Sequence, residues 1–293
     1  MYKYSWIIIT LVIFMFTGIH AIGTTKLSLS FSSKILNQDI KYSVYLPPSY
    51  NDSSKTFPVL YLLHGYTDDE TTWLKSGRVD ESINEGIKNG DMQEMIIVMP
   101  DGGLNWFVNA PQGNYNYEDM FIQEFIPWID KNYHTKVDRK ARYIGGLSMG
   151  GYGALRYAMR YSDLFSCCVA YSSALRLNEE ILKISQGRFD ELYSHVYGEG
   201  IKGEARLSKH WNENNPLYLA EKIKADNLNK VDWYIFCGKD DSFLTGNSVL
   251  VNIFKERGIK YKNLFNEGDH DWGYWSTYIK NGLEFITKMS KEE

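Results

Sequence analysis

Residues 145–151 read Gly145-Gly146-Leu147-Ser148-Met149-Gly150-Gly151 and place a serine in the pattern G-x-S-x-G. An apolar run at residues 141–144 precedes this segment, and a stretch with helical character, residues 152–161, follows it. Strand, sharp turn and helix in this order are typical of a nucleophile elbow. Glycine two residues to either side of the serine prevents side chains from colliding across the strained turn. The pattern therefore predicts Ser148 as an exposed nucleophile.

The helix that follows Ser148 is part of the same prediction. If it begins at Met149, its free backbone N–H groups point toward the place where negative charge develops when the serine attacks a carbonyl carbon. The segment then supplies both a nucleophile and one donor of an oxyanion hole, the Met149 N–H. A glycine-rich turn between a strand and a helix also permits close packing without any chemistry, so other parts of the chain have to decide between these interpretations.

Composition favours one globular domain. Of the 293 residues, 44% are hydrophobic and 23% are charged, which is enough for a full core, and no repeat or low-complexity segment is present. The formal net charge is −4, and no cluster of Lys and Arg could follow a phosphate backbone, so nucleic acid is not an expected partner. We expect no metal or cofactor, because neither H-E-x-x-H nor a Cys/His ligand spacing occurs.

Residues 1–23 have the layout of a secretory signal peptide. Lys3 provides the positive start, residues 6–16 form an apolar run, and small residues follow around Ala21 and Gly23. We expect this segment to be removed, which leaves a secreted or periplasmic domain of residues 24–293 without stable membrane insertion. The alternative is an uncleaved anchor, but residues 6–22 contain polar interruptions and are marginal for crossing a bilayer.

The three cysteines do not form a disulfide framework in this interpretation. Cys167 and Cys168 are adjacent in an apolar run and Cys237 ends another, so all three are expected to be buried thiols.

Short apolar runs alternate with segments of helical spacing along most of the chain. The runs typical of strands buried on both faces are residues 59–63, 95–99, 143–144, 167–171, 233–236 and 261–265. The helical segments are residues 79–88, 118–133, 150–161, 248–257 and 272–289. Before them, residues 27–31 and 40–45 alternate between apolar and polar, as in an antiparallel pair at a sheet edge. The alternation predicts an α/β fold with a mostly parallel central sheet and helices on both faces.

Residues 172–230 interrupt this alternation. They contain two or three short helical patterns, many charges and no convincing strand, so we interpret them as an insertion before the strand that precedes residue 238. The insertion either shapes a substrate cleft at the carboxyl edge of the sheet or is an ordinary surface excursion.

A serine nucleophile needs a histidine base and a carboxylate that orients the histidine. On an elbow of this kind the chain order is serine, acid, histidine. Two histidines precede Ser148 beyond the signal segment and two more lie in the insertion, which leaves His270, in the turn after the last expected strand. The acid is expected in the turn Gly238-Lys239-Asp240-Asp241, with Asp241 preferred and Asp240 as the fallback. A second oxyanion donor is expected at Tyr66 N–H, after the run Leu62-Leu63-His64-Gly65.

Five separated motifs give the chain a resemblance to a known group. They are Tyr45-Leu46-Pro47-Pro48-Ser49-Tyr50, Leu62-Leu63-His64-Gly65, Gly146-Leu147-Ser148-Met149-Gly150-Gly151, Gly238-Lys239-Asp240-Asp241 and His270-Asp271-Trp272-Gly273-Tyr274-Trp275. With them the chain resembles the α/β-hydrolase esterases that include esterase D, the feruloyl and acetylxylan esterases of carbohydrate esterase family 1, and the mycolyltransferases. The resemblance implies the α/β-hydrolase fold and Asp241 as the acid. It also implies that Trp106 and Trp275 border the substrate, although core packing explains either residue equally well.

Together these observations predict a serine esterase that works through an acyl-enzyme. Export and the resemblance favour the removal of feruloyl or acetyl groups from plant polysaccharide or its fragments. The alternatives are a broad short-chain carboxylesterase, an acyltransferase similar to the mycolyltransferases, and a non-catalytic binding protein on a hydrolase scaffold. The expected partner is an acylated carbohydrate or a small ester.

Overall fold

The structure is a computed structural model that describes residues 21–292. The predicted signal peptide, residues 1–23, lies outside the described residues except for its last three positions. Within the described part, no helix is long and apolar enough to cross a membrane.

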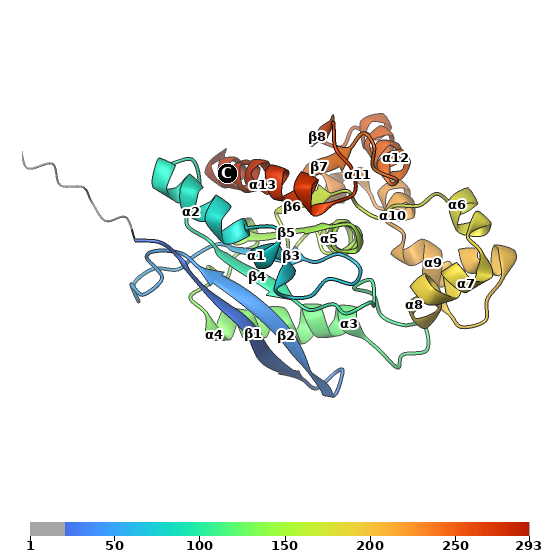
Figure 1. The fold of residues 1–293 in the computed structure, drawn as a ribbon, viewed down its shortest axis with the longest axis horizontal. Coiled ribbons are helices and arrows are strands. Elements are labelled where there is room, and N and C mark those ends of the chain that lie inside the picture. The colour runs from blue at the N-terminus through green and yellow to red at the C-terminus, as the bar shows by residue number, and fades with distance from the viewer. Residues whose placement is uncertain (1–20, 293) are drawn as a thin grey trace, which may run out of the picture.

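One sheet of eight strands forms the centre of the molecule (Figure 1). The strands are β1 (Thr24–Ser33), β2 (Gln38–Leu46), β3 (Val59–Leu63), β4 (Ile96–Pro100), β5 (Arg142–Leu147), β6 (Cys167–Tyr171), β7 (Asp232–Gly238) and β8 (Tyr261–Asn266). Their order across the sheet is β1-β2-β4-β3-β5-β6-β7-β8. β2 pairs antiparallel with both β1 and β4, while all other neighbours are parallel. The predicted edge pair and the predicted parallel sheet are therefore confirmed.

The longer helices cover both faces of the sheet. They are α2 (Val79–Asn89), α4 (Ile126–Asn132), α5 (Met149–Arg160), α12 (Leu244–Glu256) and α13 (Trp272–Glu292). A short helix, α3 (Tyr117–Asp119), and a π-helical turn (Met120–Phe125) lead into α4, and α1 (Thr72–Lys75) precedes α2. Figure 1 shows α2 and α13 on one side of the sheet, and α3 and α4 on the other.

Alternating side chains on each strand divide the core into two clusters. On β3, Val59, Tyr61 and Leu63 join the cluster under α4, α5 and α12, whereas Leu60 and Leu62 join the cluster under α2 and α13. All five side chains are fully buried. The continuous apolar run of β3 is thus explained by burial on both faces of a parallel strand.

The insertion is helical, and its first part, residues 178–214, lies at one end of the molecule (Figure 1). It comprises α6 (Asn178–Lys183), α7 (Gln186–Phe189), a π-helical turn (Asp190–Ser194), α8 (His195–Tyr197), a 3-10 turn (Gly203–Leu207), α9 (Lys209–Asn214), α10 (Pro216–Lys222) and α11 (Ala225–Leu228). No strand occurs in residues 172–230, as predicted. The segment contains more short helices than the two or three that the sequence predicts. The helices are short and separately capped, for example by the side chains of Ser185, Ser208 and Asn215, so none produces a long hydrophobic period.

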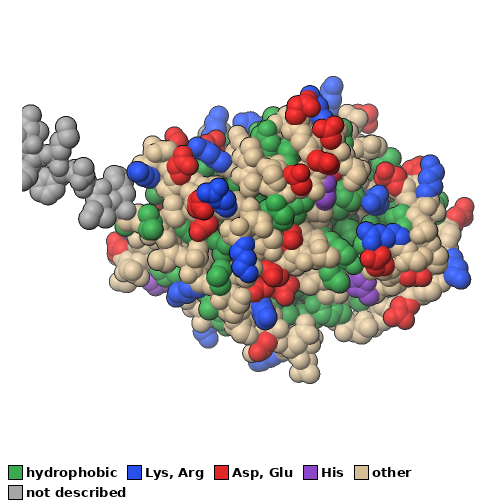
Figure 2. Space-filling view, viewed as in Figure 1, with side chains coloured by type: hydrophobic (Ala, Val, Ile, Leu, Met, Phe, Trp, Pro, Cys, Tyr) green, Lys and Arg blue, Asp and Glu red, His purple; other side chains and the backbone are tan. Residues whose placement is uncertain are grey.

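The distribution of surface charge and the state of the cysteines agree with the sequence-based predictions. Figure 2 shows acidic and basic side chains interspersed over the visible face. Cys167, Cys168 and Cys237 are buried and none forms a disulfide bond. Burial raises the pKa of the Cys168 thiol well above its ordinary value, which is typical of an inert thiol in a core.

A buried ion pair joins α3 to α5. The guanidinium of Arg156 contacts the carboxylate of Glu118, and their exposed fractions are 0% and 3%. The Glu118 carboxylate also accepts a hydrogen bond from Tyr161 at 2.7 Å and lies 3.1 Å from Arg160. Burial alone raises the pKa of Glu118, but the charges of Arg156 and Arg160 outweigh it and hold the pKa below its ordinary value.

Glu118→Gln is expected to lower the free energy of unfolding by about 3–5 kcal/mol at pH 7, because it leaves the Arg156 charge buried and unpaired. The folded-state pKa of Glu118 is depressed, so its contribution is present at neutral pH and is lost as the pH falls through that pKa. Urea unfolding at pH 7 and at pH 4 should therefore show a smaller gap between parent and variant at the lower pH. Glu81→Gln, in the exposed pair with Arg78, is the matched control and should cause no measurable loss. Equal losses for the two variants at pH 7 would contradict this account.

Candidate active site

Ser148 lies in the turn between β5 and α5 with an unusual backbone conformation. Its φ is 52° and its ψ is −115°, in the left-handed half of the map that side chains rarely occupy. The flanking glycines make this turn possible. A Cβ on Gly146 would lie 2.5 Å from the carbonyl carbon of Gly150, and a Cβ on Gly150 would lie 2.3 Å from the carbonyl oxygen of Leu63. The elbow geometry therefore requires glycine at both positions.

Ser148, His270 and Asp241 form one hydrogen-bonded chain. The Ser148 hydroxyl lies 2.9 Å from His270 Nε2, and His270 Nδ1 lies 2.9 Å from Asp241 Oδ2. An ionised carboxylate only accepts hydrogen bonds, so the proton sits on Nδ1 and leaves Nε2 free to accept from the serine. The three residues are brought together by loops after β5, β7 and β8, at the carboxyl edge of the parallel strands.

The environment of Asp241 keeps its carboxylate ionised. Its side chain is fully buried, and its other oxygen, Oδ1, accepts a hydrogen bond from Phe243 N–H at 2.7 Å. Burial raises the pKa of Asp241. The hydrogen bond and charge of His270, together with the Phe243 N–H, lower the pKa by more than burial raises it, so the net shift is downward. The neighbouring Asp240 is exposed to solvent, and its backbone N–H donates to the Gly268 carbonyl at 3.0 Å. Of the two aspartates, only Asp241 contacts His270.

The loop after β3 lies beside the nucleophile. A Cβ on Gly65 would lie 3.7 Å from Ser148 Cβ, so this loop passes close to the serine. Buried His64 fixes the loop, because its Nε2 accepts from Gly102 N–H at 2.8 Å and its Nδ1–H donates to the Gly65 carbonyl at 2.8 Å. Tyr66 follows directly and lines the cavity at Ser148. Met149 is the first residue of α5, and its side chain is buried in the core, so only its backbone could take part in the site.

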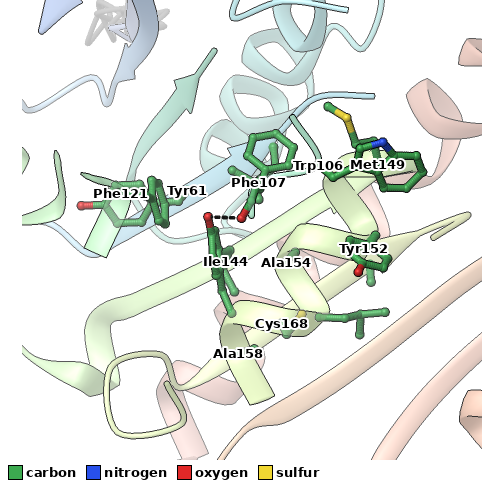
Figure 3. Packing of buried hydrophobic residues seen from close by; sticks show 14 of the residues in the cluster. Tyr61, Trp106, Phe107, Phe121, Ile144, Met149, Tyr152, Ala154, Ala158 and Cys168 are labelled. Carbon is green, nitrogen blue, oxygen red and sulfur yellow. Dashed lines mark hydrogen bonds between the residues drawn. The ribbon is translucent and has the colours of Figure 1, made fainter. Parts of the chain in front are cut away.

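A cavity of about 380 Å³ opens onto Ser148 and His270. Trp106 and Trp275 both line it, as the resemblance implies. The Trp106 indole N–H donates to the Leu192 carbonyl of the insertion at 2.8 Å, and its ring packs 4.9 Å from that of Tyr193. Figure 3 shows Trp106 beside Met149 and Tyr152. The Trp275 ring meets the His270 imidazole at 4.9 Å in an edge-to-face arrangement.

The insertion contributes one wall of this cavity. The lining residues that sequence reasoning missed are Asp68, Ala174, Arg176, Arg188, Leu192, Tyr193, Ser242, Phe243 and Trp272. Those from residues 174–193 belong to the segment whose role the sequence left open. The structure supports a cleft-shaping role, because Arg176 and Tyr193 stand in the same cavity as Ser148. No periodicity or motif marks these residues. Ala174 and Arg176 lie in the irregular loop after β6, and Arg188, Leu192 and Tyr193 lie in α7 and the π-helical turn that follows it.

The other described histidines lie elsewhere and have their own partners. His195 Nε2 lies 2.8 Å from the Leu104 carbonyl, His210 Nε2 lies 3.1 Å from the Val196 carbonyl, and His134 stacks on Tyr50. Among residues 21–292, no group of three or more His, Cys, Asp or Glu side chains is arranged to hold a metal ion.

Comparison with known proteins identifies the family. A family model described as "Putative esterase" matches residues 33–286. The acetyl esterase of Caldicellulosiruptor saccharolyticus is 28% identical over 90% of this chain and 98% of its own length. An endo-1,4-beta-xylanase/feruloyl esterase of Xylanibacter ruminicola is 35% identical over 47% of this chain and 20% of that longer protein.

Solved structures give the same result. A ferulic acid esterase superposes with a TM-score of 0.79 and 29% identity, over 92% of this chain and 99% of that one. The eight-stranded sheet and the elbow thus belong to the α/β-hydrolase fold, as predicted. The chain belongs to this esterase family of α/β-hydrolases and is a serine carboxylic-ester hydrolase.

Proposed function

We propose that this protein removes feruloyl or acetyl groups from plant polysaccharide or its fragments, outside the cytoplasm. The observation that carries the proposal is the hydrogen-bonded chain from Ser148 through His270 to Asp241, which opens into an aromatic-walled cavity of about 380 Å³. The similarity to an acetyl esterase and to a ferulic acid esterase supports these two acyl groups. Residues 24–293 would be the exported domain after removal of residues 1–23.

The proposed reaction proceeds in two steps. Ser148 Oγ attacks the ester carbonyl carbon while His270 Nε2 takes the hydroxyl proton, and His270 then gives this proton to the leaving alcohol. Water, deprotonated by the same nitrogen, releases the acid from Ser148. Asp241 holds the imidazole in the required tautomer and stabilises its positive charge. The Tyr66 and Met149 N–H groups would bind the carbonyl oxygen as it becomes negative.

Pairs of esters with the same alcohol or the same acyl group test the substrate class. Methyl ferulate is compared with methyl 3-cyclohexylpropanoate, and acetylated xylo-oligosaccharide is compared with ethyl acetate. We expect kcat/KM for at least one natural-type ester to exceed that of its simple counterpart by about tenfold or more, because aromatic or sugar rings would contact the tryptophans and tyrosines of the cavity. If neither natural-type ester is preferred, the protein is a broad short-chain carboxylesterase and the proposal is wrong.

A further inference from the structure

Two arginines stand in the wall of the cavity that contains Ser148. Arg188 forms an ion pair with Glu191 at 2.8 Å, and both side chains are more than half exposed. Arg176 differs, because no carboxylate among residues 21–292 forms an ion pair with it and its buried Nε–H has no hydrogen-bond partner. A guanidinium without a counter-charge in a binding cavity is suited to a carboxylate ligand, which it can hold with two parallel hydrogen bonds.

Aromatic packing holds Arg176 in place next to the catalytic centre. Its guanidinium lies over the Phe243 ring, 4.8 Å from the ring centroid. Phe243 in turn packs 5.0 Å from the His270 imidazole. Arg176 also acts on Tyr193, whose pKa is raised by burial and lowered in part by the charge and hydrogen bonding of the arginine. Because the contacts with Phe243 and Tyr193 restrain the side chain, little side-chain entropy is lost when Arg176 binds an anion.

The position of Phe243 indicates which part of an ester meets Arg176. His270 must give its proton to the leaving oxygen, so the alcohol part of the substrate has to lie on the side of His270. Phe243 packs against His270 and Arg176 packs on Phe243, so we infer that this wall faces the alcohol.

The cavity also contains one carboxyl group, that of Asp68, which lies in the loop after β3. A Cβ on Gly65 would lie 3.0 Å from Asp68 Oδ2, so the Asp68 carboxyl is next to that loop. Burial raises the pKa of Asp68, although hydrogen bonds with the Gly65 backbone and with Trp272 lower it in part. No ion pair joins Asp68 to Arg176 or Arg188 among the described residues. The cavity therefore carries positive charge on the Phe243 side and a carboxyl group beside Gly65.

We propose that Arg176, with Arg188 as a second cation, binds a carboxylate on the alcohol part of the ester. Preferred substrates are then acyl esters of an acidic sugar or of another alcohol that carries a carboxylate. This inference rests on the proposed function, since it assigns a substrate class to the same site, and it predicts selectivity that a neutral acylated sugar would not reveal.

Two phenyl acetates of nearly equal size measure this selectivity. 4-Acetoxybenzoate carries a carboxylate on its leaving group, whereas 4-acetoxybenzamide carries a neutral amide, and each rate is divided by the hydroxide-catalysed rate of the same ester. We expect kcat/KM to favour the carboxylate by about tenfold, as a charge-assisted hydrogen bond would give. In Arg176→Gln the ratio of kcat/KM for the carboxylate ester to that for the amide ester should fall to about one. In Arg176→Lys the ratio should be intermediate, because lysine keeps the charge but loses the planar guanidinium that stacks on Phe243. In Arg188→Gln the ratio should fall less than in Arg176→Gln.

Lys209→Gln is the matched control, because it removes one exposed positive charge from the same insertion. Its ratio should equal that of the parent. A parent ratio of one or less, or an unchanged ratio in Arg176→Gln, overturns the inference while leaving the esterase activity standing. A preference for mono-4-nitrophenyl succinate over 4-nitrophenyl butyrate that depends on Arg176 overturns the assignment to the alcohol. Failure to cleave any acetate, ferulate or xylan ester would instead overturn the proposed function.

Discussion

Ser148→Ala is expected to lower kcat for a simple acyl ester by about 10⁴-fold or more, because no other described hydroxyl contacts His270 Nε2. The fold should survive, since alanine keeps the Cβ and the backbone bonds of the elbow. In particular, the residue 148 N–H still donates to the Tyr171 carbonyl, and its own carbonyl still accepts from Ala174 N–H. Initial rates with 4-nitrophenyl acetate and the thermal midpoint give the two readouts. The midpoint should change by no more than about 2 °C.

Ser54→Ala provides the matched control for this variant. Ser54 is exposed in a turn and bonds only to Asp52 among the described residues, so its loss should leave the rate unchanged. If Ser148→Ala keeps more than about a tenth of the parent rate while it is folded, another nucleophile carries the reaction.

Asp241→Asn is expected to reduce kcat by about 10⁴-fold, although the side chain keeps its size. An amide at this position can donate its N–H to His270 Nδ1, which moves the imidazole proton to Nε2. The histidine is then held in the tautomer that cannot accept the proton of Ser148. The same change removes the negative charge that stabilises the imidazolium. Initial rates across pH 6–9 measure the loss.

Asp240→Asn is the natural comparison, because it makes the same chemical change one residue away on an exposed side chain that does not contact His270. Its rate should stay within about twofold of the parent, as expected for a surface substitution. Equal losses for the two variants, or a larger loss for Asp240→Asn, would show that the assignment of the acid is incorrect.

The elements with the simplest environments were predicted most accurately. The strands Val59–Leu63 and Cys167–Tyr171 have the predicted bounds, because each is a five-residue apolar run buried on both faces and bounded by turn residues. β5 was predicted only at residues 143–144, yet it extends from Arg142 to Leu147. The glycines at 145 and 146 hide it in the sequence. They belong to the strand because both pair with β3 and β6. Glycine is needed at residue 145, where a Cβ would lie 2.6 Å from the Val169 side chain.

A similar close approach hides the start of α12. The sequence predicts a helix from residue 248, whereas α12 begins at Leu244. Its first turn contains Gly246, where a Cβ would lie 2.1 Å from the Leu175 carbonyl oxygen. Glycine is a weak helix former, so the sequence pattern begins only after it. Tertiary packing against the insertion determines this boundary, and local sequence cannot show it.

In the active site too, some residues could be predicted from the sequence and others could not. Ser148, Asp241 and His270 could be predicted because strand order restricts where a nucleophile, an acid and a base can follow one another in the chain. In the structure these side chains form two contacts of 2.9 Å. The wall containing Arg176 could not be predicted, since Arg176 lies in an irregular loop after β6 and the adjoining residues Leu192 and Tyr193 reach Trp106 from the π-helical turn of the insertion. Chain order positions the reacting groups in this fold, whereas irregular packing around them determines which substrates enter.

Covalent trapping tests the central claim most directly. An alkyl fluorophosphonate reacts with a serine hydroxyl that is activated by a neighbouring base, and the adduct mimics the tetrahedral intermediate. Intact mass should show one phosphonyl group per chain, and peptide mapping should place it on Ser148, with no adduct in Ser148→Ala. Loss of esterase activity should follow the extent of labelling. An adduct on a different residue, or full ester hydrolysis by a chain that carries the adduct at Ser148, would contradict the account.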